Sequence, residues 1–299
     1  MTMTNRGNRP MKGILLAGGK GTRLYPLTLQ TSKQLLPVYN KPMLYYPLTT
    51  LMLAGVTEVL IVTTPHDQPQ FKTLLGDGSQ WGISIAYEIQ EAPKGIAQAI
   101  EIGAEFVGTD PVVLMLGDNV LYGRLDFLRN AIDAQASNAV VFGCHVSDPS
   151  AFGVVEFDKA YNALTIEEKP SKPKSNWAVP GIYIYPNDVV QKVRDLKPSD
   201  RGELEITDLN RMYMNEGRLK AFPMGRGIAW FDTGTPGHLL RAAAFVESIE
   251  SQQGLVIGAP EEAAYRMGYI AKEEIAKTIA NLPNCHYRTY LEHVLDEDI

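Results

Sequence analysis

The sequence predicts an α/β protein with a three-layer, Rossmann-like fold, a mixed and mostly parallel sheet, and a C-terminal helical extension. Three observations support this prediction. Short apolar runs alternate with helical patterns through the first 116 residues, which is typical of parallel strands connected by helices. A glycine-rich loop directly follows the first apolar run. After residue 235, the apolar residues recur only at helical spacing.

The individual elements follow from the same patterns. In the N-terminal part, strands are predicted at residues 13–17, 58–63, 83–89 and 111–116, and helices at 43–54, 68–75 and 96–107. In the middle part, extended runs lie at residues 138–145, 152–157, 163–168, 177–185 and 228–231, with helices at 188–196 and 203–216. We interpret the middle part as insertions that elaborate the same sheet. Ligands of such sheets bind beyond the carboxyl ends of the strands.

The chain is expected to divide into three segments. Residues 1–10 are polar and are predicted to be a disordered extension. Residues 11–235 are expected to form the main domain with its insertions. Residues 236–299 are expected to form a helical region, because apolar residues recur there at helical spacing, and its role would be packing or subunit contact.

Composition excludes several classes of function. Hydrophobic residues make up 45% of the chain and charged residues 21%, as in an ordinary globular protein. Lys and Arg number 28 against 34 Asp and Glu, so we expect no nucleic-acid partner. No apolar run reaches the length of a membrane span or resembles a signal peptide, which predicts a cytoplasmic protein. Cys144 and Cys285 lack the spacing of a zinc site or a disulfide framework.

The glycine-rich loop is the strongest chemical signal. Residues 18–23 read GGKGTR, and three glycines allow backbone amides to approach an anion. Thr22 adds a hydroxyl and Arg23 a guanidinium suited to phosphate. The loop is neither a P-loop nor a dinucleotide fingerprint, because Leu24 occupies the place of the third glycine. The alternative is a plain tight turn, but three glycines followed by Thr-Arg favour a phosphate site.

Charged residues at the ends of other predicted strands extend this signal. Lys33 alone reads as a solvated surface group, but beside a phosphate loop it can be a second cation. Asp118 and Asp232 each end a strand; they are either turn residues or ligands of Mg²⁺, which prefers carboxylate and phosphate oxygens. Glu168 and Lys169 are either solvent-facing or bind a sugar hydroxyl and its phosphate. Together these residues indicate metal-assisted phosphoryl or nucleotidyl transfer.

These motifs, in this order, resemble those of the bacterial glucose-1-phosphate thymidylyltransferases, within the sugar-phosphate nucleotidyltransferase family. The similarity runs from about residue 11 to the C-terminal helices. It covers LAGGKGTRL at 16–24, SKQLLPV at 32–38, LGDN at 116–119, FGVVEF at 152–157, EEKP at 167–170, RGELEITD at 201–208 and WFDTGT at 230–235. The resemblance implies a nucleotidyltransferase fold that makes dTDP-glucose and pyrophosphate from dTTP and glucose 1-phosphate, the first step of dTDP-L-rhamnose biosynthesis.

The resemblance also implies roles for individual residues. Arg23, Lys33, Asp118, Lys169 and Asp232 would be catalytic, with Mg²⁺ on Asp118 and Asp232. The nucleotide would be bound by Leu16, Gly18, Gly19, Gly21, Thr22, Arg23, Gln34, Gln90, Gly95 and Asp118, with the pyrimidine base at Gln34, Gln90 and Gly95. The sugar phosphate would be bound by Gly153, Glu168, Lys169, Val179 and Tyr183.

A homotetramer with a second nucleotide site is implied as well. A dTDP-sugar feedback inhibitor would bind there through Tyr122, Gly123, Arg226, Glu262 and Arg266. Two departures are present, because Phe152 replaces the usual Tyr and the segment after Gly123 lacks the usual histidines. The alternatives are a UTP-using sugar-1-phosphate uridylyltransferase and a catalytically silent nucleotide-sugar sensor. The complete set of cations and carboxylates disfavours the sensor.

Overall fold

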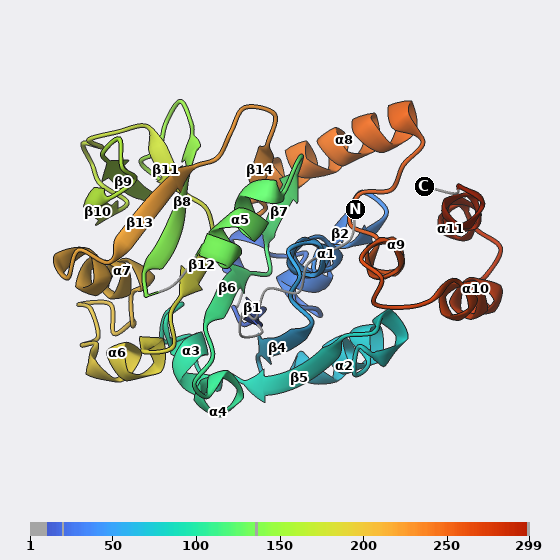
Figure 1. The fold of residues 1–299 in the computed structure, drawn as a ribbon, viewed down its shortest axis with the longest axis horizontal. Coiled ribbons are helices and arrows are strands. Elements are labelled where there is room, and N and C mark those ends of the chain that lie inside the picture. Colours follow the sequence, from blue (N-terminus) through green and yellow to red (C-terminus); the bar gives the residue numbers. More distant parts are fainter. Residues whose placement is uncertain (1–10, 20, 135–136, 298–299) are drawn as a thin grey trace.

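In the computed structural model, which describes residues 11–19, 21–134 and 137–297, one mixed sheet of ten strands organises the molecule (Figure 1). The strand order is β10-β9-β11-β8-β12-β6-β1-β4-β5, and β13 pairs with β8. The strands are β1 (Lys12–Leu16), β4 (Glu58–Thr63), β5 (Ser84–Ile89), β6 (Val112–Leu116), β8 (Ala139–His145), β9 (Gly153–Phe157), β10 (Ala163–Glu168), β11 (Trp177–Val179), β12 (Ile182–Tyr185) and β13 (Leu219–Pro223). The predicted extension at residues 1–10 lies outside the described residues.

The N-terminal half of the sheet is parallel. Strand β1 pairs in parallel with β4 and β6, and β4 pairs in parallel with β5. Leu16 is level with both Val62 and Leu116, so the carboxyl ends of three strands meet at one edge. The loops that follow β1 and β6 therefore leave the sheet side by side, and both carry predicted site residues.

The middle of the chain continues this sheet with mainly antiparallel strands. Strand β12 is antiparallel to β6 and β8, and β9 is antiparallel to β10 and β11. The run predicted as one strand at residues 177–185 is two strands, because the chain turns at Gly181. A Cβ atom there would lie 2.5 Å from Leu116 Cγ, so only glycine allows the chain to pass β6 at this point. The mixed α/β sheet predicted from the sequence is confirmed.

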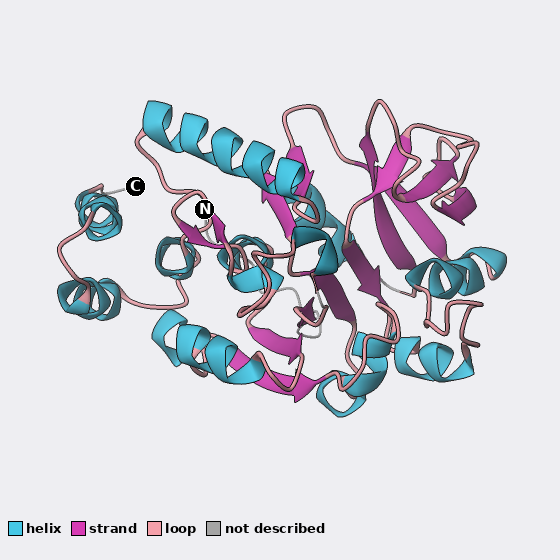
Figure 2. Ribbon diagram, turned by 180° about the vertical axis from the view of Figure 1, so that it is seen from behind, coloured by secondary structure: helices cyan, strands magenta, loops and turns pink. Residues whose placement is uncertain are grey.

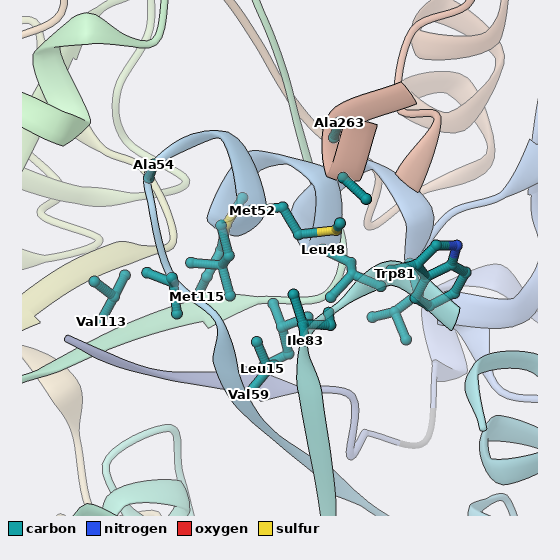
Figure 3. Close-up of a cluster of buried hydrophobic side chains, with 14 of the residues drawn as sticks. Leu15, Leu48, Met52, Ala54, Val59, Trp81, Ile83, Val113, Met115 and Ala263 are labelled. Atoms are coloured by element: carbon teal, nitrogen blue, oxygen red, sulfur yellow. The ribbon is translucent and has the colours of Figure 1, made fainter. Parts of the chain in front are cut away.

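Helices cover both faces of the sheet because alternate strand residues point to opposite sides. On one face, Leu15, Val59 and Met115 pack under α1 (Tyr45–Leu53) and α2 (Gln68–Leu75), as Figure 3 shows for Leu48 and Met52 of α1. On the other face, Ile14 and Leu114 pack against α3 (Gln98–Ile102), α6 (Val189–Asp195) and α7 (Ile206–Asn215). Burying one such aliphatic side chain contributes roughly 1.5–3 kcal/mol, so both layers are held firmly on the sheet.

Two predicted helices differ in the structure, each for a packing reason. The helix expected at 96–107 is divided into α3 and α4 (Ala104–Val107) at Gly103, where a Cβ would lie 2.8 Å from Leu60 Cδ2. The helix expected from residue 203 begins at Ile206. The backbone of Leu204 instead donates to the carbonyl of Lys94 at 2.7 Å, which commits this residue to an extended pairing.

Four helices follow the last sheet residues: α8 (Pro236–Gln253), α9 (Pro260–Arg266), α10 (Lys272–Asn281) and α11 (His286–Asp296). Figure 2 shows α8 as a long helix extending from the strand region toward the C-terminal helices. A separate two-stranded sheet pairs β7 (Asn119–Tyr122) with β14 (Ala229–Asp232), and β2 (Pro37–Val38) pairs with β3 (Lys41–Pro42). Helix α5 (Asp126–Ala134) precedes β8. None of the described helices has the length and apolar character needed to cross a membrane.

Candidate active site

A cavity of about 310 Å³ opens where β1 and β6 end, and we call it the sheet-edge cavity. Its wall includes thirteen of the residues singled out from the sequence: Leu16, Gly18, Gly19, Arg23, Lys33, Gln34, Asp118, Gly153, Glu168, Lys169, Val179, Tyr183 and Asp232. These residues come from segments as far apart as 16 and 232 in the chain. The topology brings them together because several strands end at the same edge of the sheet.

The glycine-rich loop forms one wall of this cavity. A Cβ atom at Gly18 would lie 2.7 Å from Gln90 Oε1, so the close packing of the loop against this side chain requires glycine. Gly21 adopts a left-handed backbone with φ of 57°, and its carbonyl accepts a hydrogen bond from Thr28 Oγ1 at 3.0 Å. The loop is thus held in a tight turn that leaves backbone groups facing the cavity.

Arg23 extends from this loop across the cavity to the end of β14. A Cβ atom at Gly234 would lie 2.6 Å from Arg23 Nη2, so the glycine makes room for the guanidinium. The same hypothetical Cβ would be 3.1 Å from Asp232 Oδ1. Arg23 therefore lies close to this carboxylate while remaining exposed to solvent, a position from which it can contact a bound phosphate.

Asp118 and Lys33 form a mostly buried ion pair inside the cavity, between Lys33 Nζ and Asp118 Oδ2. Burial alone would raise the pKa of Asp118, but the charge of Lys33 and hydrogen bonds from Lys33 and Asn119 outweigh it, so the pKa lies below its ordinary value. Asp118 is therefore a carboxylate at neutral pH. The ion pair holds Lys33 at a fixed place in the cavity.

Asn119 holds the ends of three strands around Asp118. Its Nδ2 donates to Asp118 Oδ1 at 3.1 Å, and its Oδ1 accepts from Trp230 Nε1 at 2.6 Å and from the backbone amide of Gly181 at 3.1 Å. This fixes β7, β14 and the start of β12 relative to the carboxylate. Sequence reasoning assigned no role to Asn119, although its place directly after Asp118 at a strand end was a usable signal.

Asp232 faces the same region from the paired strand. Asp232 is opposite Asn119 in the β7–β14 register. Burial and the negative charge of Asp118 raise the pKa of Asp232, against smaller opposing effects of nearby cations. Two carboxylates that repel each other in this way favour a cation between them. Among the described residues no cluster of three or more potential metal ligands is present.

Polar groups from the end of β10 and from α7 also line the cavity. Thr207 Oγ1 donates to Glu168 Oε2 at 2.7 Å, and Lys169 Nζ lies 3.4 Å from Glu168 Oε1. Lys169 has a φ of 43°, which is unusual for a residue with a side chain. Its amide donates to the carbonyl of Phe152 at 3.0 Å, and this bond helps to hold the strained backbone.

Four residues assigned to nucleotide binding are not part of the cavity wall: Gly21, Thr22, Gln90 and Gly95. Gln90 is buried behind Gly18, and its Nε2 donates to Gln98 Oε1 at 2.7 Å. Gly95 packs against Leu204, whose carbonyl oxygen would lie 2.3 Å from an added Cβ. Conversely, Thr207 and Asn210 of α7 line the cavity without having been predicted, because polar residues on a helix give no periodic signal.

A second cavity of about 240 Å³ lies between α1, β7, α9 and α11. Tyr122, Gly123, Glu262 and Arg266 line it, whereas Arg226 is not part of its wall. Glu262 accepts from Arg266 Nε at 2.7 Å and from Tyr290 Oη at 2.6 Å. The hydroxyl of Thr49, another wall residue, is buried without a hydrogen-bond partner in the described structure. We call this space the second cavity.

Known proteins with similar sequences share one description. Residues 12–249 match the family described as nucleotidyl transferase. The chain is 52% identical to a glucose-1-phosphate thymidylyltransferase of Neisseria gonorrhoeae over 95% of this chain and 99% of that protein. It is 51% identical to the one of Mycobacterium tuberculosis over 96% of this chain and the whole of that protein.

Solved structures give the same architecture. A structure described as a Bacillus anthracis glucose-1-phosphate thymidylyltransferase in complex with sucrose superposes with a TM-score of 0.74 at 41% identity, covering 79% of this chain and 94% of that one. A UDP-glucose pyrophosphorylase in complex with UDP-glucose has a TM-score of 0.72 at 23% identity, covering 80% of this chain and 99% of that one. The second similarity concerns the fold alone.

Proposed function

We propose a reaction from one premise, which is that the chain belongs to the nucleotidyl transferase family and, within it, to the glucose-1-phosphate thymidylyltransferases. The enzyme joins dTTP and glucose 1-phosphate to give dTDP-glucose and pyrophosphate. It acts in the cytoplasm, where dTTP is available, and serves the synthesis of dTDP-L-rhamnose. The observation that supports this reaction most directly is the arrangement of the sheet-edge cavity. Arg23, the Lys33–Asp118 pair and Asp232 line one cavity together with the Glu168–Lys169 pair.

In the reaction, a phosphate oxygen of glucose 1-phosphate attacks the α-phosphorus of dTTP. The new P–O bond forms as the bond between the α- and β-phosphates breaks, and pyrophosphate leaves. Lys33 and Arg23 offset the negative charge that develops on the α-phosphate and the leaving group. Lys33 is held before substrate arrives by its ion pair with Asp118, and Arg23 lies beside Gly234. Catalysis then depends on positioning and electrostatics, without a covalent intermediate on the enzyme.

Asp118 and Asp232 would hold Mg²⁺, with phosphate oxygens as its other ligands. When bound there, the ion supplies charge neutralisation for the triphosphate. In the same cavity, Lys169 binds the phosphate of the sugar and Glu168 accepts hydrogen bonds from sugar hydroxyls. Thr207 keeps the Glu168 carboxylate oriented through their hydrogen bond. Gly153 lies beside this carboxylate, since an added Cβ would be in van der Waals contact with Glu168 Oε2 at 3.6 Å.

Pyrophosphate release measured with dTTP, UTP and ATP against glucose 1-phosphate tests this function. We expect the highest kcat/KM with dTTP. Preference for UTP would identify a uridylyltransferase, since a pocket distinguishes one methyl group by only about 1–3 kcal/mol. Absence of turnover with all three, together with retained nucleotide-sugar binding, would identify a sensor and contradict the proposal.

The second cavity supports a regulatory role in the same enzyme. We propose that a dTDP-sugar binds there as a feedback inhibitor in a homotetramer. Arg266 provides a cation for a phosphate, and the unpaired hydroxyl of Thr49 provides a buried polar group for the ligand. Strand β7 reaches both sites, since Asn119 lines the sheet-edge cavity and Tyr122 lines the second cavity. Arg226 would have to reach this ligand from outside the cavity wall.

A further inference from the structure

The most informative group that the proposed reaction does not use is the side-chain amide of Asn210. Asn210 lies on α7, one helical turn after Thr207, so both residues face the same side of the helix. Both line the sheet-edge cavity, and Asn210 is only 1% exposed. Its Nδ2 is a buried nitrogen without a hydrogen-bond partner in the described part of the chain. A buried donor left unpaired destabilises a protein unless something else satisfies it.

A hydrogen bond from Tyr185 fixes the orientation of the Asn210 amide. Tyr185 Oη donates to Asn210 Oδ1 at 2.8 Å. Tyr185 is fully buried and does not line the cavity, so the carbonyl end of the amide points into the protein. The Nδ2 end, which has no partner among the described residues, lies away from Tyr185. Tyr185 is itself held between the rings of Tyr183 and Tyr213, at 6.2 and 5.8 Å between centroids, which makes this orientation rigid.

The surroundings indicate the chemistry of the missing partner. Thr207 Oγ1 is committed to Glu168, so the polar groups on this face of α7 run from the Glu168 carboxylate to the Asn210 amide. Among the other wall residues, Ile206 and Val179 are apolar, and Tyr183 carries a hydroxyl. The unpaired Nδ2 group is an uncharged donor, and a sugar hydroxyl can accept a hydrogen bond from it.

We propose that Asn210 is a specificity-determining residue that donates a hydrogen bond to one hydroxyl of the bound sugar phosphate. The inference rests on the proposed function, because it assumes that the sugar occupies the end of the cavity near Glu168. A site built to pair one hydroxyl strongly rejects an analogue that lacks it, since the protein group is then left unpaired. Asn210 would therefore select for a hydroxylated sugar and against a deoxy-sugar at one ring position.

The test compares glucose 1-phosphate with its 2-, 3-, 4- and 6-deoxy analogues by kcat/KM, with dTTP as donor. In the wild type we expect at least one analogue to be rejected by about 10-fold or more. For each analogue, the ratio of interest is kcat/KM for glucose 1-phosphate divided by kcat/KM for the analogue. In Asn210→Ala we expect this ratio to fall to within about three-fold of unity for the analogue that the wild type rejects. The ratios for the other analogues should stay unchanged. Asn215→Ala, an exposed asparagine on the same helix, is the matched control and should alter none of the ratios.

A structural role for Asn210 would give a different pattern. Loss of the Tyr185 contact alone would lower activity for all analogues equally, and that outcome would overturn the proposal. Should Asn210→Ala fold poorly, the double variant Tyr185→Phe/Asn210→Leu replaces both polar groups with apolar ones of similar size, and the same ratios are measured. Failure of the proposed function is a separate result. It would appear as no turnover of glucose 1-phosphate by the wild type. In that event we would identify the hexose 1-phosphate that the wild type accepts and test Asn210 with the deoxy analogues of that sugar.

Discussion

The sheet-edge cavity and the second cavity are similar in size, at about 310 and 240 Å³, and differ in how their charges are held. In the sheet-edge cavity, Asp118 follows the end of β6, Asp232 ends the strand that pairs with β7, and Lys33 is held by its ion pair with Asp118. In the second cavity, one ion pair of Arg266 with Glu262 lies among mostly apolar residues from separate helices. The comparison teaches that a rigid sheet edge holds charged side chains in place for catalysis, whereas a space between helices suits reversible binding of a ligand.

This difference predicts which substitutions slow uninhibited turnover most. Arg23→Ala should lower turnover by about 10²-fold or more, because it removes a preorganised contact to the charge of the transition state. The side chain is exposed, so the unfolding temperature should stay unchanged. Turnover is measured by pyrophosphate release and folding by thermal unfolding. Arg124→Ala serves as control, since that side chain is 92% exposed and lines neither cavity. A folded Arg23→Ala enzyme with near-normal turnover would exclude the catalytic role.

The carboxylates of the sheet-edge cavity are expected to have the next largest effect. Asp118→Asn and Asp232→Asn should each raise the Mg²⁺ concentration for half-maximal rate by about 10-fold, because each removes an anionic oxygen ligand. Initial rates are measured over a Mg²⁺ titration at saturating dTTP. Asp126→Asn, on an exposed carboxylate, should leave the curve unchanged. If neither substitution shifts the metal dependence, the two residues are structural turn residues.

The sequence predicted the sheet edge well for a physical reason. Apolar strands followed at once by glycine or acidic residues mark where the chain leaves a sheet, and parallel strands bring such points together. This argument predicted that Arg23 and Asp118 lie near one another. It does not cover Lys33, which lies on a short 3-10 segment, or Asp232, which ends β14 of the separate two-stranded sheet. The position of Gln90 could not be predicted in the same way. Its burial behind Gly18 depends on a side-chain packing distance of under 3 Å, which has no sequence pattern.

Helix positions were harder to predict, and the second cavity depends on them. Thr207 and Asn210 lie three positions apart on α7. Polar residues at this spacing occur on many surface helices, so the pattern does not identify a site. Strand β13, helix α5 and helices α9 and α10 were not predicted, although α5 is clearly amphipathic. Glu262 and Arg266 were assigned through family resemblance alone. The hydrogen bond from Tyr290 of α11 to Glu262 is set by helix packing across 28 residues of sequence.

At the sugar end of the sheet-edge cavity, a smaller effect is expected. Thr207→Val removes the hydrogen bond to Glu168 but keeps the shape of the side chain. We expect the KM for glucose 1-phosphate to rise about five-fold, in line with the loss of one hydrogen bond to a charged group that remains partly solvated. The KM for dTTP should change less than two-fold. Equal increases in both KM values would show that the substitution disturbs the cavity as a whole.

Arg266→Ala is expected to change uninhibited turnover least, by less than about two-fold, because Arg266 lies in the second cavity and touches none of the sheet-edge residues. It should nevertheless weaken inhibition by dTDP-rhamnose by about 10-fold, since a charge-assisted contact to a phosphate contributes roughly 1.5–3 kcal/mol. Inhibition is measured with dTTP saturating, in the wild type and in the variant. Arg288→Ala, which removes a similar ion pair with Glu292 outside the cavity, is the matched control.

The outcome decides whether the two cavities act separately. Loss of inhibition with unchanged basal turnover would support a regulatory site coupled to the sheet edge through a difference in affinity between two states. Equal inhibition in both proteins, or inhibition that disappears when dTTP is raised, would place the inhibitor in the sheet-edge cavity. The absence of Arg226 from the second cavity wall and the altered segment after Gly123 make this measurement necessary. If the inhibitor binds in the sheet-edge cavity, the second cavity would have no part in feedback, and the helical region would serve subunit contact alone.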